Sequence, residues 1–140
     1  MADIQLHNTL SGKIENFVPQ KAGEVRMYTC GPTVYDYAHI GNYRTFVFQD
    51  ILRRFLKLRG FKLNHVMNLT DVDDRIIANA AAAGVGIRDY TAKFVQAFFD
   101  DCNALSIEAP EHWIRATDHI EEMVKLIQRL QEKSFTYPGD

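Results

Sequence analysis

A cysteine and a histidine lie near the two ends of one stretch of the sequence, MYTCGPTVYDYAHIGNYR, at residues 27–44. Cys30 precedes a Gly-Pro pair, and His39 opens the tetrapeptide His-Ile-Gly-Asn, which ends at Asn42. A thiolate can bind a soft metal ion, whereas an imidazole and a carboxamide can donate hydrogen bonds to phosphate oxygens. The stretch therefore carries groups suited to two different chemistries.

The segments around this stretch predict a βαβ unit. Residues 25–30 (VRMYTC) are typical of a buried strand that ends at a Gly-Pro pair, and a helix is expected over about 41–59. Residues 62–68 (KLNHVMN) are typical of a second strand. Strands joined by a crossover helix run parallel, and ligands bind at their carboxyl ends. Cys30 and the segment 68–71 should therefore lie at one edge of a sheet.

The start of the predicted helix is suited to an anion. Its first N–H groups are unpaired and its dipole is positive there, so phosphate would be attracted. Gly41 would let a ligand approach the backbone closely, while His39 and Asn42 could donate hydrogen bonds to a departing phosphate. The alternative is structural, with His39 as a satisfied turn histidine and Asn42 as a helix cap.

Apolar and basic residues predict two faces for this helix. The residues expected to face the core are Phe48, Ile51, Leu52, Phe55 and Leu58. Basic side chains fall largely on the other side, at Arg53, Arg54, Lys57 and Arg59. These could contact RNA phosphates, but a solvated helix face is the preferred interpretation.

Composition predicts one ordinary globular domain. The chain has 140 residues, 46% hydrophobic and 24% charged, and a net charge of −2 does not indicate a nucleic-acid binder. No leader and no apolar run of membrane-helix length is present, so a cytoplasmic protein without a membrane partner is expected. Two cysteines without CxxC spacing predict neither a disulfide framework nor a self-contained metal site, so further ligands for Cys30 would come from elsewhere.

The flanking segments predict a hairpin and three further helices. An edge strand or a hairpin is expected over 4–18, and helices over about 72–83, 88–105 and 118–133. Cys102 falls on the apolar face of the second of these helices and is interpreted as a small core residue. Residues 134–137 are typical of a strand that enters a turn without a partner, which suggests part of a larger protein.

Three carboxylates follow the second strand, at Asp71, Asp73 and Asp74. Such a cluster could hold magnesium. The preferred interpretation is structural: Asp71 caps the next helix, and the other two complement the dipole in its first turn.

Together these motifs resemble one family. CGPTVYDYAHIGN, followed by NLTDVDD at residues 68–74, is similar to the opening of cysteinyl-tRNA synthetases, which are class I aminoacyl-tRNA synthetases. The likeness extends to residues 8–10 and 115–117. It implies an α/β fold in which residues 1–133 form the first half of a Rossmann-type parallel-sheet catalytic domain with a helical extension. Residues 134–140 would then begin a truncated connecting insertion.

The resemblance also implies roles for individual residues. Cys30 matches a zinc ligand, and His39 and Gly41 match the HIGH-type signature that binds ATP, with His39 and Asn42 in catalytic positions. Asn42 replaces the second histidine of that signature; its amide can donate to phosphate but carries no positive charge. The positions that match the amino-acid pocket are Gly31, Thr33 and Thr70.

The function implied by the resemblance is cysteine–tRNA ligation. L-cysteine would be activated by ATP with magnesium to cysteinyl-adenylate and transferred to cysteine tRNA, and zinc would select sulfur over oxygen. One zinc ligand and no KMSKS-type loop are present, so the chain alone should be inactive. Alternatives are the related cysteine ligase of mycothiol synthesis, a non-catalytic nucleotide-binding or partner-binding fragment, and a general nucleotidyltransferase.

Overall fold

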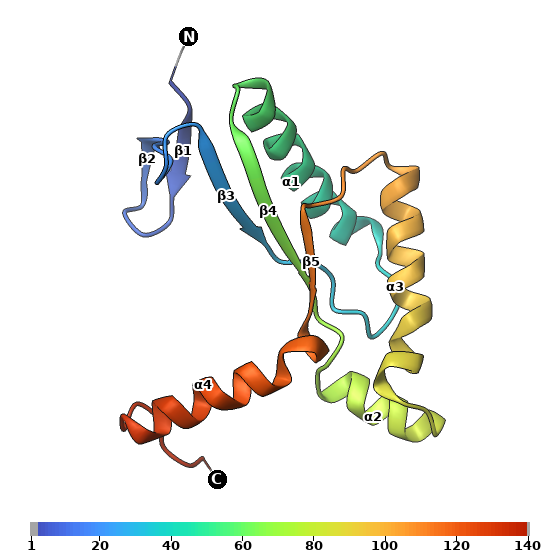
Figure 1. The fold of residues 1–140 in the computed structure, drawn as a ribbon. Coiled ribbons are helices and arrows are strands. Elements are labelled where there is room, and N and C mark those ends of the chain that lie inside the picture. The colour runs from blue at the N-terminus through green and yellow to red at the C-terminus, as the bar shows by residue number, and fades with distance from the viewer. Residues whose placement is uncertain (1–2, 140) are drawn as a thin grey trace.

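A parallel sheet forms the centre of the fold. The computed structural model describes residues 3–139. The three strands of the sheet are β3 (Glu24–Thr29), β4 (Lys62–Leu69) and β5 (His112–Arg115), in the order β3-β4-β5 (Figure 1). Helix α1 (Ile40–Leu58) joins β3 to β4, and both strand pairs are parallel. The predicted βαβ unit is confirmed.

The remaining elements are a hairpin and further helices. They are the antiparallel hairpin β1 (Gln5–Asn8) and β2 (Lys13–Asn16), helix α2 (Asp74–Ala83), helix α3 (Ile87–Ala104), the short 3-10 helix η1 (Ala116–His119) and helix α4 (Ile120–Glu132). The predicted hairpin and the three further helices are confirmed. Within the described residues, none of the helices is both long and apolar enough to cross a membrane.

Two strand predictions differ from the structure. Strand β5 was not predicted, because four residues are too few for an alternating pattern; Trp113 fixes it by packing against Phe98 and Phe99 of α3. The strand predicted over 134–137 is wrong. Residues 135–139 have neither helix nor strand structure, and Phe135 is exposed.

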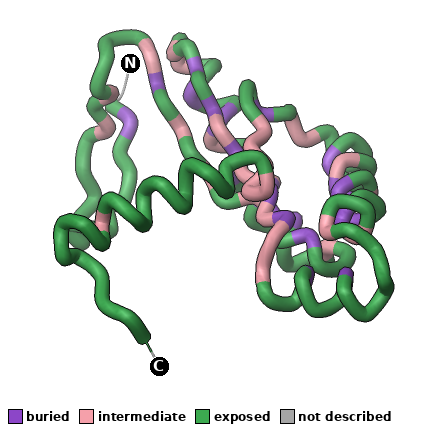
Figure 2. Tube along the Cα trace, turned by 60° about the horizontal axis from the view of Figure 1, so that its bottom comes forward, coloured by how far each residue is buried: buried purple, intermediate pink, exposed green. Residues whose placement is uncertain are grey.

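The core lies between the sheet and two helices on one of its faces. Every second residue of β4 is buried, namely Leu63, His65, Met67 and Leu69. The main cluster joins β4 to α1 and α3, and Cys102 lies within it, as predicted. Buried positions concentrate on these elements in Figure 2, whereas α4 is exposed along almost all its length.

The predicted inner face of α1 is wrong. Phe48, Ile51 and Leu58 are exposed, at 65%, 59% and 82% of their surface. The buried positions of α1 are instead Tyr43, Phe46, Gln49, Arg53 and Leu56. An arginine occupies the inner face because its charge is paired there, so apolar periodicity alone selected the wrong side of the helix.

Arg53 is paired with two glutamates from the loop before β5. Its Nη1 and Nη2 atoms each donate to Glu111 at 2.7 Å, and its Nε atom donates to Glu108 at 3.2 Å. The backbone N–H of His65 donates to Glu111 as well, at 2.8 Å. Hydrogen bonds from Arg53, and then from the His65 backbone, lower the pKa of Glu111 to about 2. A solvated role for Arg53 is therefore wrong.

Two other basic residues of α1, Arg54 and Lys57, also have partners within the chain. Arg54 contacts Asp50 at 2.7 Å and donates to the Ser106 carbonyl at 2.6 Å, while Lys57 contacts Glu108 at 2.6 Å. The contacts with Ser106 and Glu108 join α1 to the loop that leads into β5.

The carboxylate predicted to cap α2 does something else. Asp71 is fully buried and accepts hydrogen bonds from Thr117, from N at 2.9 Å and from Oγ1 at 2.7 Å. The cap of α2 is Asp73, which accepts from the Ile76 N–H at 2.7 Å, and Asp74 lies in the first turn. Asp71 therefore ties the end of β4 to η1 after β5. Its assignment as a cap was wrong, whereas the structural interpretation of the three carboxylates holds.

Candidate active site

The connection from β3 to α1 is held against the end of β4. Thr33 and Thr70 form an isolated parallel bridge beyond the strands. The Val34 N–H donates to the Thr70 carbonyl at 3.1 Å, and the Thr70 N–H donates to the Pro32 carbonyl at 3.0 Å. Val34 is buried beneath this bridge. Both segments therefore meet at the carboxyl edge of the sheet, as predicted.

Gly31 is required by a close backbone approach. A Cβ atom at this position would lie 1.9 Å from the carbonyl oxygen of Asn68, so no larger residue fits without a backbone shift. The Gly31 N–H donates to Asn68 Oδ1 at 3.1 Å, and Asn68 Nδ2 donates to Thr70 Oγ1 at 2.9 Å. The side chain of Asn68 thus connects two of the predicted pocket residues.

Cys30 follows β3 directly and is exposed. The prediction of a buried strand is wrong here, because β3 lies at the edge of the described sheet and only Val25 is buried in it. Among the described residues, no group of three or more histidine, cysteine, aspartate or glutamate side chains could hold a metal ion. The thiol of Cys30 is thus accessible but has no partner ligands here.

Two buried polar residues hold the segment around Cys30, Gln49 through the Cys30 backbone and His65 through the Thr29 side chain. The carbonyl of Cys30 accepts a hydrogen bond from Gln49 Nε2 at 3.4 Å. Thr29 Oγ1 lies 2.8 Å from His65 Nε2, and Arg53 Nη1 lies 3.4 Å from His65 Nδ1. Arginine can only donate, so Nδ1 is the acceptor and Nε2–H donates to Thr29. Burial, and then the charge of Arg53, lower the pKa of His65, which keeps it neutral.

Sequence reasoning missed both of these anchoring residues. Gln49 has one sequence signal, its spacing of three and four residues from Phe46 and Arg53 on the inner row of α1. His65 occupies a buried position of the alternating pattern of β4, but nothing in the sequence shows which groups face it.

His39 and Asn42 form a reciprocal cap at the start of α1. His39 is the N-cap residue, and its Nδ1 atom accepts from the Gly41 N–H at 3.0 Å. Its own N–H donates to Asn42 Oδ1 at 3.0 Å. Because Nδ1 accepts from a backbone donor, the proton of the neutral ring lies on Nε2. A capping role for this pair is confirmed, but the assignment differs from the prediction, because His39 is the N-cap residue and Asn42 is its partner in the first turn. His39 Nε2–H and Asn42 Nδ2 remain as donors with no partner among residues 3–139.

The cap changes how an anion would be bound. The N–H groups of Gly41 and Asn42 are occupied by His39, the second through the His39 carbonyl at 2.8 Å. A Cβ atom at Gly41 would lie 2.8 Å from His39 Cε1, so glycine makes room for the folded ring. The first turn of α1 contains no acidic residue. An anion at this helix start would therefore be bound mainly by the side-chain donors of His39 and Asn42, and less by backbone N–H groups.

A hollow of about 330 Å³ collects four of the predicted residues. They are Gly31, Thr33, His39 and Asn42. The other lining residues are Pro32, Tyr35, Asp36, Tyr37, Ala38 and Phe46, so one carboxylate also borders the hollow. Cys30, Gly41 and Thr70 do not line this hollow, although each adjoins it along the chain or through a backbone hydrogen bond. The structure therefore brings most of the predicted set together.

Helix α3 supports the wall of this hollow. The rings of Tyr37 and Phe94 meet edge to face, with centroids 5.1 Å apart. Tyr90 donates from its hydroxyl to the Tyr35 carbonyl at 3.2 Å. These contacts attach the loop to a packed helix, which preorganises the hollow.

Comparison with known families decides the membership of this chain. Residues 16–140 match the family described as tRNA synthetases class I (C) catalytic domain. The chain belongs to this family. Its fold agrees: a methionyl-tRNA synthetase of Mycobacterium tuberculosis, solved in complex with methionyl-adenylate, superposes with a TM-score of 0.67 at 22% identity. The superposition covers 78% of this chain and 22% of that one, and shows a shared fold.

Named relatives in the synthetase family are similar over almost the whole chain. A cysteine–tRNA ligase of Koribacter versatilis is 60% identical over 96% of this chain and 27% of its own length. One from Solibacter usitatus is 53% identical over 98% of this chain and 29% of its own length. A third, from Thermococcus kodakarensis, is 43% identical over 97% and 29%. The chain thus spans less than a third of the length of these relatives.

Proposed function

We propose that this chain supplies the first half of the active site of a cysteine–tRNA ligase. The observation that carries the proposal is the cap at the start of α1, which leaves His39 Nε2–H and Asn42 Nδ2 as donors beside the hollow. The exposed thiol of Cys30 lies at the other end of the same pinned connection. Relatives named cysteine–tRNA ligase favour this function over ligation to a different acceptor.

In the first step of the proposed reaction, a carboxylate oxygen of L-cysteine attacks the α-phosphorus of ATP. The bond to the bridging oxygen breaks, and pyrophosphate leaves with the negative charge. His39 Nε2–H and Asn42 Nδ2 donate to phosphate oxygens, where they stabilise the charge that develops. Gly41 positions the His39 ring. In the second step, a terminal ribose hydroxyl of cysteine tRNA attacks the carbonyl carbon, and AMP leaves.

The amino-acid pocket is proposed at Gly31, Thr33 and Thr70. Gly31 and Thr33 line the hollow, which supports their role. Thr70 is supported only by its backbone pairing with Pro32 and Val34 and by its contact with Asn68. Thr70 is therefore proposed to position the pocket more than to touch the substrate.

Zinc is proposed to be held by this chain through Cys30 alone. The described residues do not form a zinc site by themselves, because such a site needs about three protein ligands and no group of three comes together among them. The further ligands are proposed to come from protein outside this chain. The division into 1–133, the first half of the Rossmann-type domain, and 134–140, the start of an insertion, is part of the same proposal.

The test separates capping from catalysis at His39. Cysteine-dependent exchange of pyrophosphate into ATP is measured on a protein of the relatives' full length. His39→Asn replaces the Nδ1 cap acceptor with an amide oxygen and removes the imidazole donor, whereas His39→Ala removes both the cap acceptor and the donor. Exchange should fall by about 10²-fold or more in both variants, since a preorganised donor is lost. Wild-type exchange in His39→Asn would reduce His39 to a cap and end its catalytic assignment.

A pair of cysteine variants tests the thiol. Cys30→Ala should abolish cysteine-dependent exchange, while Cys102→Ala, which alters a buried core thiol, should keep it at a temperature where the variant is folded. Undiminished exchange in Cys30→Ala would remove Cys30 from substrate selection. Metal analysis of the 140-residue chain should find no stoichiometric zinc, and tightly held zinc would contradict the single-ligand assignment.

A further inference from the structure

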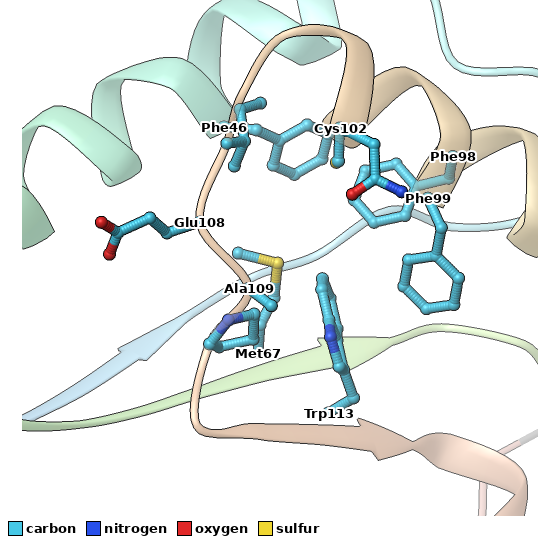
Figure 3. A pocket seen from close by; sticks show the side chains of 11 residues that line it. Phe46, Met67, Phe98, Phe99, Cys102, Glu108, Ala109 and Trp113 are labelled. Atoms are coloured by element: carbon cyan, nitrogen blue, oxygen red, sulfur yellow. The ribbon is translucent and has the colours of Figure 1, made fainter.

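A second hollow, apart from the candidate active site, lies beneath α3. Its volume is about 270 Å³, and it is enclosed by α1, α3, the sheet and the loop before β5 (Figure 3). The principal lining residues are Phe46, Met67, Phe98, Phe99, Cys102 and Trp113. We call it the Trp113 cavity. Ala109 and Asn103 are exposed lining residues, so the cavity opens to solvent on their side.

The walls of this cavity are apolar and aromatic. Trp113 packs edge to face against Phe98 and Phe99, with centroids 5.9 and 5.1 Å away. Burial, and then the nearby charge of Asp101, raise the pKa of the Cys102 thiol to about 11, so this side chain is neutral. The carboxylate of Glu108, which also borders the cavity, is engaged by Arg53 and Lys57. A charged ligand would find no free counter-charge inside.

We propose that the Trp113 cavity binds a small uncharged molecule with one or two aromatic rings and a hydrogen-bond acceptor. Size supports this class, since an apolar cavity of about 150 Å³ can hold benzene and this one is larger. Ring edges and faces in the wall suit an aromatic guest. Among residues 3–139 no acceptor is bonded to Trp113 Nε1–H or to the Asn103 amide, so either can donate to the ligand.

The cavity shares two residues with the surroundings of the candidate active site. Phe46 lines both hollows. Met67 lines the Trp113 cavity, and its Cγ lies 3.0 Å from where a Cβ of Gly31 would be, so it packs against that glycine. A ligand that moves either side chain therefore changes the wall next to Gly31 and His39. Binding of a ligand in the Trp113 cavity should therefore change the conformation of the candidate active site.

The experiment uses 4-fluoroanisole, which has one ring and an ether acceptor, with the 140-residue chain. Trp113 is the only tryptophan of the sequence, so its fluorescence reports on the cavity directly. We expect a saturable fluorescence change, broadening of the ¹⁹F resonance, and nuclear Overhauser contacts from the probe to Phe99 and Trp113. The charged analogue 4-fluorobenzoate should not bind. Non-saturable signals, or equal binding of the two probes, would overturn the proposal.

Two alanine variants form the matched comparison. Ala109→Phe places a ring in the mouth of the cavity, whereas Ala104→Phe adds the same ring at an exposed position of α3 that does not line it. Binding should weaken by about tenfold or more in Ala109→Phe and stay unchanged in Ala104→Phe, because only the first competes for the space. Equal affinities would contradict the assignment. If Ala109→Phe folds poorly, the Overhauser contacts in the unsubstituted chain still show whether the probe binds in the cavity.

Saturation with the probe should also shift the amide resonances of Gly31 and His39. Unshifted resonances there would overturn the coupling through Phe46 and Met67. A relative of full length that fails to bind the probe would show that other protein fills the cavity, which would overturn a ligand site.

Discussion

Helices α3 and α4 have similar sequence patterns and opposite environments. Five residues of α3 are buried, namely Thr91, Phe94, Val95, Phe98 and Cys102. Helix α4 presents an apolar row of the same kind, but it has no buried residue, and Ile120, Met123, Val124 and Ile127 are all exposed. In Figure 1, α3 lies along the sheet, whereas α4 extends away from the end of β5. An amphipathic pattern therefore predicts a helix face but not whether anything covers it.

The difference matters for the candidate active site. Phe94 and Tyr90 on α3 hold the loop that forms the hollow, so the packing of α3 is also the support of the site. Within residues 3–139, the main neighbour of α4 is η1, and α4 contributes no residue to the lining of the hollow. Stability should therefore be concentrated in the layer of α1, α3 and the sheet.

The largest expected effect comes from truncating an aromatic residue on α3. Phe98 is 2% exposed and contacts four other rings, so Phe98→Ala should lower the free energy of unfolding by about 3–5 kcal/mol. The matched variant Ile127→Ala on α4 should change it by less than about 0.5 kcal/mol, because Ile127 is half exposed. Urea unfolding at neutral pH measures both values. Equal losses would show that α4 packs as α3 does.

Loss of the Arg53–Glu111 pair should have a smaller effect on the packed layer. Glu111→Gln should cost about 1–3 kcal/mol at pH 7, toward the low end because the carboxylate is one third exposed. Its folded-state pKa of about 2 lies below the ordinary 4.5, so the charged pair stabilises the fold above pH 4.5. That stabilisation is lost as the pH falls from 4.5 toward 2.

Unfolding measured from pH 7 to pH 2.5 checks this dependence. Glu111→Gln should flatten the loss of stability below pH 4.5. The control is Glu24→Gln, which removes an exposed partner of Lys21 and should leave stability at pH 7 unchanged. An unaltered pH profile in Glu111→Gln would mean that another carboxylate controls acid stability. The pKa of His65 is also lowered in the folded state, so the free energy of unfolding should decrease further as the pH falls below about 6.5.

Local sequence signals predicted the elements and the start of α1 well. The Gly-Pro stop of β3, the spacing of His39 and Asn42 and the alternation of β4 are encoded within a few residues. For this reason the βαβ unit and four of the residues that line the hollow could be located without coordinates. The cap itself was weighed as an alternative, and it coexists with free donors on the same two side chains.

The failures involve partners that are distant in sequence. Arg53 can be buried because it pairs with Glu111, which lies 58 residues away in the sequence. Asp71 can be buried because it accepts from Thr117, which lies 46 residues away. Neither pairing leaves a periodic signal, so a charged residue was assigned to solvent and an aspartate to the nearest helix end. Strand β5 was not predicted for a related reason: Trp113 is held by contacts with α3, and not by residues close to it in the sequence.

The smallest expected effect compares one lysine on each helix. Lys93 of α3 lies over the Phe94 ring at 4.7 Å, so Lys93→Ala should lower the free energy of unfolding by about 0.5–1 kcal/mol. Lys125 of α4 contacts Glu121 at 3.9 Å with both side chains largely exposed, so Lys125→Ala should stay within about 0.5 kcal/mol of the original chain. Alanine is the stronger helix former, which offsets the lost pair. Urea unfolding monitored by circular dichroism distinguishes the two, and a loss near 1 kcal/mol in Lys125→Ala would place α4 in the cooperative unit and remove its contrast with α3.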